Sequence, residues 1–107
     1  MINDDVGSAF NICVSICGQD GVISRKEEEA IIDKFKSTFE LGDDDFDELF
    51  DNFFATNDHI DSYLEKVTNV DLQRKILLIS EYSAAIDGFD VRENIAFQRV
   101  KLVWGIS

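Results

Sequence analysis

The chain has 107 residues, of which 45% are apolar and 11% aromatic, with nine Phe and no Pro. This supply of hydrocarbon can fill the core of one domain and excludes a disordered chain. The formal net charge is -12 and the isoelectric point is near 4.2. Both values argue against direct binding to nucleic acid or to an anionic membrane, because those partners require a cationic surface.

No apolar run reaches the length of about 18 residues that a membrane span needs. The first residues, from Met1 to Asp5, are acidic where a secretory signal would be basic. We therefore expect one domain over residues 1–107, in the cytoplasm. Cys13 and Cys17 stand four residues apart in an apolar run. A disulfide across one helical turn is geometrically awkward, so we expect two buried free thiols in a reducing compartment.

Apolar residues recur at helical spacing from one end of the chain to the other, which predicts an all-α protein. The first helix should cover residues 5–17 and stop at Gly18. Ser24 and Glu27 form a capping-box pattern, so a second helix should run over 24–41 and end at Gly42. Further helices are expected near 43–56, 59–67, 70–86 and 90–104. The result is a compact single-domain bundle of about six helices.

The apolar spacing also predicts which side of each helix is buried. Segment 70–86 is the most hydrophobic, so we expect it at the centre, with the Tyr82 ring and Ile86 buried. In the last helix the expected buried residues are Val91, Ile95, Ala96, Val100, Val103 and Trp104. Segment 46–54 has five apolar residues in nine, more than a narrow stripe needs. We therefore expect one of its Phe residues at the surface, beside the acids.

The charge is concentrated in one segment, residues 40–65, which we call the acidic sector. It has no Lys or Arg and contains ten of the 22 acids, namely Glu40, Asp43, Asp44, Asp45, Asp47, Glu48, Asp51, Asp58, Asp61 and Glu65. Like charges at helical spacing, such as Asp43 and Asp47, each cost roughly 0.2 to 0.5 kcal/mol of helix stability. This cost favours a cationic partner, the alternative being a solvated face that keeps the chain soluble. The expected partner-binding residues are Asp43, Asp44, Asp47, Glu48, Asp51, Asp58, Asp61 and Tyr63.

Two segments repeat one pattern, a helix end, an Asp-Gly turn, a cap and a glutamate. They are residues 17–27 and 85–93, and the second turn is one residue shorter. This weak internal two-fold repeat resembles the TerB-like domains associated with tellurite resistance, which are compact and helical. The resemblance implies a metal site, carried by motif onto Asp20, Glu27, Asp87 and Glu93. The alternative is structural, because Asp-Gly favours a turn and a glutamate after a cap satisfies helix N–H groups. We expect no metal or other cofactor.

No catalytic set emerges, because His59 has no Ser or Cys partner at a suggestive spacing and no glycine loop could hold phosphate. We therefore expect a protein that is not an enzyme. In general character the chain resembles bacterial immunity proteins of the contact-dependent growth inhibition and colicin systems. The leading hypothesis is an acidic inhibitor that covers the cationic cleft of a toxin nuclease. The alternatives are a TerB-like metal-binding stress-response protein, or a nucleic-acid mimic that inhibits a host factor.

Overall fold

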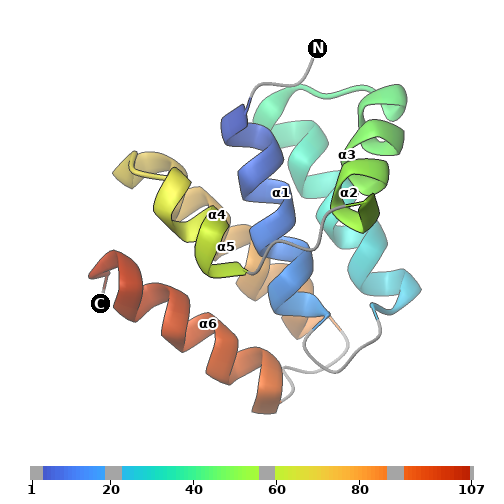
Figure 1. The fold of residues 1–107 in the computed structure, drawn as a ribbon. Coiled ribbons are helices and arrows are strands. Elements are labelled where there is room, and N and C mark those ends of the chain that lie inside the picture. The colour runs from blue at the N-terminus through green and yellow to red at the C-terminus, as the bar shows by residue number, and fades with distance from the viewer. Residues whose placement is uncertain (1–3, 19–22, 56–59, 87–90, 107) are drawn as a thin grey trace.

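The computed structural model describes residues 4–18, 23–55, 60–86 and 91–106 (Figure 1). These residues form six helices and no strand, which confirms the predicted all-α bundle. The helices are α1 (Asp4–Cys17), α2 (Arg25–Phe39), α3 (Asp43–Ala55), α4 (Ile60–Lys66), α5 (Val70–Ala85) and α6 (Val91–Trp104). No helix in the described part of the chain is both long enough and apolar enough to cross a bilayer.

Local hydrogen bonds fix where several helices begin and end. The predicted capping box is present: the Glu27 N–H donates to Ser24 Oγ at 3.1 Å, and the Ser24 N–H donates to Glu27 Oε1 at 3.2 Å. Helix α2 ends earlier than expected, at Glu40, whose φ of 57° is left-handed. Gly42 instead precedes α3 and donates its N–H to Asp45 Oδ2 at 2.9 Å. Gly105, with φ 68°, ends α6 as predicted.

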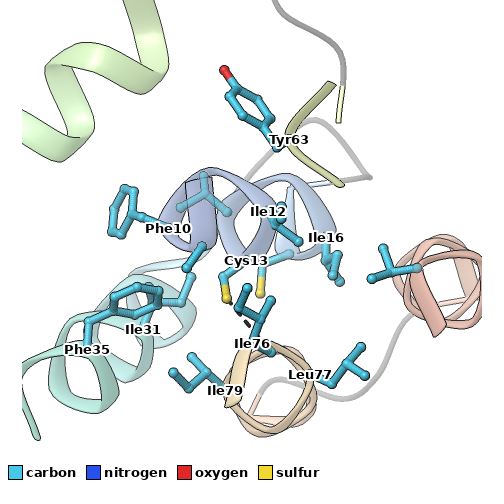
Figure 2. Packing of buried hydrophobic residues seen from close by; sticks show 14 of the residues in the cluster. Phe10, Ile12, Cys13, Ile16, Ile31, Phe35, Tyr63, Ile76, Leu77 and Ile79 are labelled. Carbon is cyan, nitrogen blue, oxygen red and sulfur yellow. Dashed lines mark hydrogen bonds between the residues drawn. The ribbon is translucent and has the colours of Figure 1, made fainter. Parts of the chain in front are cut away.

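Helix α1 lies at the centre of the bundle and contacts each of the other five helices (Figure 1). This corrects the expectation that α5 is central. The reason is that α1 has buried residues on all its sides, including Phe10, Ile12 and Cys13. Figure 2 shows Phe10 on the side of α1 that faces Ile31 and Phe35 of α2, and Cys13 pointing toward Ile76 of α5.

Aromatic rings join α1 to α2 and α3. The Phe10 ring lies 5.5 Å from Phe35, 6.2 Å from Phe46 and 4.9 Å from Phe50, measured between ring centroids. Two of these pairs, with Phe35 and Phe50, meet edge to face, the geometry that the ring quadrupoles favour. Phe10 is fully buried, so one side chain holds three helices together.

The exposed and buried sides of α6 differ from the prediction. Val91, Ile95 and Val103 are exposed, whereas Glu93 and Phe97 are buried in their place. Val100 is buried as predicted, and Ala96 and Trp104 are partly buried. Apolar residues lie on two sides of this helix, so spacing alone does not fix its rotation. Helix α4 fixes the rotation of α6 about its axis, because Trp104 Nε1 donates a hydrogen bond to the Leu64 carbonyl of α4 at 3.1 Å.

The end of α5 is also more exposed than expected. Ile86 is exposed, and the Tyr82 side chain lies at the surface with Lys34 Nζ 4.4 Å from its ring centre. Because Tyr carries a polar group at its tip, a partly wet position under a lysine suits it.

Candidate functional site

Three ionisable side chains meet in the interior where the end of α1 lies beside the first turns of α2 and α6. They are Cys17, Glu27 and Glu93, which are 0%, 5% and 4% exposed. One ligand atom from each, the Cys17 sulfur and one carboxylate oxygen of each glutamate, lies within 4.8 Å of the other two. Two of the four residues that the TerB-like resemblance suggested are therefore brought together. The other two, Asp20 and Asp87, lie outside the described residues.

Glu27 has a partner for one oxygen but not for the other. Its Oε1 accepts the Ser24 N–H in the capping box. Its Oε2 is buried and accepts no hydrogen bond from the described residues. Leaving a buried polar atom unsatisfied costs about 1 to 3 kcal/mol, and more when the group is charged. The positive end of the α2 dipole offsets part of this cost, but it gives Oε2 neither a hydrogen-bond donor nor a cation to bind.

The cysteines are free and buried, as predicted. Burial raises the pKa of Cys13 to about 12, although a hydrogen bond from Ser80 Oγ at 3.2 Å acts in the opposite direction. Burial also raises the pKa of Cys17 well above its usual range, and the charges of Cys13, Glu27 and Glu93 raise it further. Cys17 is therefore a neutral thiol at pH 7, and a cation beside it would favour loss of its proton.

The three side chains fit a divalent cation. Two ligand atoms on one tetrahedral zinc ion, each at about 2.0 to 2.3 Å from it, lie roughly 3.3 to 3.8 Å apart. Atoms up to 4.8 Å apart must therefore approach one another by about 1 Å to share an ion. The Oε2 atom of Glu27, which accepts no hydrogen bond from the described residues, could be a ligand of such an ion. Cys17 was interpreted from the sequence only as a core thiol, although it begins the first copy of the repeat.

Helix α3 carries the dense part of the acidic sector, and two of its acids have structural partners. Asp43 forms a hydrogen-bonded ion pair with Lys36. The hydrogen bond and the charge of the lysine both lower the pKa of the Asp43 carboxyl. Asp45 accepts the Gly42 N–H at the start of the helix. Acids in the first turn are also favoured by the helix dipole. Asp43 and Asp45 therefore stabilise the start of α3 locally, which offsets part of the like-charge cost expected for this segment.

Four other acids of α3 are exposed and form no ion pair with any residue that the structure describes. We call them the unpaired acids: Asp44, Asp47, Glu48 and Asp51. On α4, Asp61 forms an ion pair with Arg99 of α6 at 2.8 Å. Tyr63 is only 5% exposed, because it packs into the core beside α1, and this corrects its expected place on the binding surface. Asp58 and His59 lie outside the described residues.

One Phe of α3 lies at the surface beside these acids, as expected. Phe54 is 73% exposed. Its ring stacks on Phe50 at 6.3 Å and meets Phe53 edge to face at 5.3 Å. The three rings form one side of a groove of about 410 Å³, which is lined by Val14, Ser15, Gly18, Ile23, Glu28, Phe50, Phe53 and Phe54.

Comparison of the chain with known protein families, with curated proteins and with solved structures finds no match.

Proposed function

We propose that the chain is a small cation-binding domain of the TerB-like kind, in which Glu27 and Glu93 hold a divalent metal ion together with Cys17. The observation that carries this proposal is the buried cluster, with its ligand atoms within 4.8 Å and the unsatisfied Oε2 of Glu27. It is supported by the position of both glutamates in the repeat that resembles TerB-like domains. A stress-response role follows from that resemblance.

The donor set favours one class of ion. Calcium and magnesium take oxygen ligands almost exclusively, whereas zinc accepts thiolate and carboxylate together. When bound, the ion would supply positive charge to two buried carboxylates. Glu27 and Glu93 would bind it, and Cys17 would release its proton to become the third ligand. We therefore expect tighter binding of zinc than of calcium or magnesium.

Calorimetry of the purified protein with zinc, calcium and magnesium tests this proposal. Glu27→Gln and Cys17→Ser should each weaken zinc binding at least about tenfold, a loss of 1.4 kcal/mol. Glu28→Gln is the matched control, because Glu28 is the neighbouring glutamate of α2 and is exposed. No zinc binding by the wild type, or equal binding by Glu27→Gln and Glu28→Gln, would reject the site.

A second function is favoured by a separate observation, the unpaired acids beside the exposed ring of Phe54. In this proposal the chain is a cytoplasmic immunity protein that neutralises a cationic toxin nuclease by covering its substrate cleft. A nuclease must present a basic surface to phosphate, so fixed carboxylates can occupy that surface and speed association. A nucleic-acid mimic directed at a host factor would use the same charges.

A matched pair of quadruple variants tests the second function. One variant neutralises the unpaired acids by three Asp→Asn changes and one Glu→Gln change. The control makes the same changes at four exposed acids on other helices, Asp5, Asp33, Asp71 and Glu81. The first variant should lose protection of cells that express the toxin, and its toxin binding should depend less on salt. Equal protection by both variants would show that the acids of α3 only solvate the protein.

A further inference from the structure

We infer that the groove between α1 and α3 binds the apolar face of a cationic amphipathic helix. This inference rests on the second proposed function, the capture of a basic protein by the unpaired acids. It adds the shape of the partner segment and the residues that would hold it.

The groove is lined mainly by apolar side chains. Val14, Ile23 and Phe53 line it, and its volume of about 410 Å³ lies within the usual range of about 300 to 1,000 Å³ for binding pockets. At its edge Phe54 remains 73% exposed although two neighbouring rings hold it in place. Burying a Phe side chain contributes about 1.5 to 3 kcal/mol, so a partner that covers Phe54 gains this free energy.

The charge around the groove selects the partner. Asp47 and Asp51 stand seven and three residues before Phe54, which places them on the same side of α3. Glu28 lines the groove from α2, and no Lys or Arg is among the described residues that line it. Basic residues beside the apolar anchors of a partner would therefore meet carboxylates. A second copy of the chain would bring its own α3 acids against them, so charge disfavours self-association here.

A helix is the form of partner that this surface suits. The described residues contain no strand, so they offer no sheet edge to which an extended peptide could add. A groove between two helices instead accepts apolar side chains at positions i, i+3, i+4 and i+7 of an incoming helix. Lysine or arginine on both sides of that stripe would reach Glu28 on one side and Asp47 and Asp51 on the other.

Fluorescence anisotropy with two labelled synthetic peptides tests the inference. Both are helical peptides of about 18 residues with the same lysines. One has Leu and Phe at the four anchor positions, and the other has Ala there. The anchored peptide should bind the wild type at least about tenfold more tightly, a difference of 1.4 kcal/mol. Raising the salt from about 50 to 300 mM should weaken binding of both peptides.

Phe54→Ala should weaken binding of the anchored peptide about tenfold and leave binding of the Ala peptide unchanged. The matched control is Leu102→Ala, because Leu102 is 81% exposed but lies on α6. Equal affinity for the two peptides would overturn the groove while leaving charge-based capture standing. Equal effects of Phe54→Ala and Leu102→Ala on binding of the anchored peptide would also overturn the proposed role of the groove. If neither peptide binds, or if neutralising the unpaired acids leaves the affinity of both peptides unchanged, both the groove inference and the proposed capture of a basic partner are wrong.

Discussion

The substitution Glu27→Gln should raise the stability of the metal-free protein and reduce the stabilisation that zinc provides. Gln keeps the side-chain oxygen that accepts the Ser24 N–H, so the cap survives. It removes one of two carboxylates that lie within 4.8 Å of each other in the interior. Two unit charges at that distance repel by about 3.5 kcal/mol at an effective dielectric constant of about 20. Without metal, the variant should therefore gain about 1 to 3 kcal/mol in its free energy of unfolding.

Zinc should reduce the stability difference between the two proteins, because it stabilises the wild type more than the variant. A ligand at a hundred times its Kd adds about 2.7 kcal/mol to the stability of the state that binds it. For a domain of this size that gain corresponds to a rise of roughly 10 to 20 °C in the melting temperature. The wild type should show the full rise, and Glu27→Gln, with zinc binding weakened at least about tenfold, should show at most about half of it. The control Glu28→Gln, altered at an exposed carboxylate, should follow the wild type in both conditions.

Urea unfolding and thermal melts, each with chelator and with zinc, measure both effects. If Glu27→Gln loses more than about 1 kcal/mol in chelator, the charge of Glu27 stabilises the metal-free fold and the repulsion argument is wrong. An equal zinc-induced rise in the wild type and the variant would place the bound zinc elsewhere on the chain.

Three further predictions concern the core, the thiols and the start of α3. Phe10→Ala should lower the free energy of unfolding by about 3 to 5 kcal/mol in urea titrations, because the Phe10 ring contacts three other rings. Burial raises the pKa of Cys13 to about 12, so Ellman's reagent should label it at about pH 8 only after denaturation; rapid labelling of the native protein would contradict this. Lys36 lowers the pKa of Asp43, so the stability from this pair is present above the unfolded pKa of Asp43 and disappears as pH falls through the folded pKa. The stability difference between wild type and Lys36→Met should therefore vanish in acid, and a constant difference would refute the pairing.

Features that depend on a few adjacent residues were predictable from the sequence. The capping box of Ser24 and Glu27 closes within one turn, so the residue types determine it. The exposed Phe54 follows from simple geometry, since five apolar residues in nine exceed one side of a helix. The order and approximate bounds of the helices agree for the same reason.

Features that depend on contacts between distant helices were not predictable. The rotation of α6 depends on the bond from Trp104 to the Leu64 carbonyl, which is 40 residues away. The place of Cys17 beside Glu27 and Glu93 depends on how α2 and α6 approach the end of α1. Apolar spacing within one helix contains neither piece of information, because it shows which residues share a side but not what faces them.

Glu27 and Glu93 both have a carboxylate at a buried position, and this charge tells more about function than about helix capping. Glutamine serves equally well at the third position of a capping box, so capping alone does not require a charge at Glu27. A second carboxylate, Glu93, is buried within reach of the first. Placing two acids together in an interior costs free energy that two glutamines, or two apolar residues, would avoid. A cation held between them offsets this cost, so the paired charges favour the metal-binding proposal over a purely structural role.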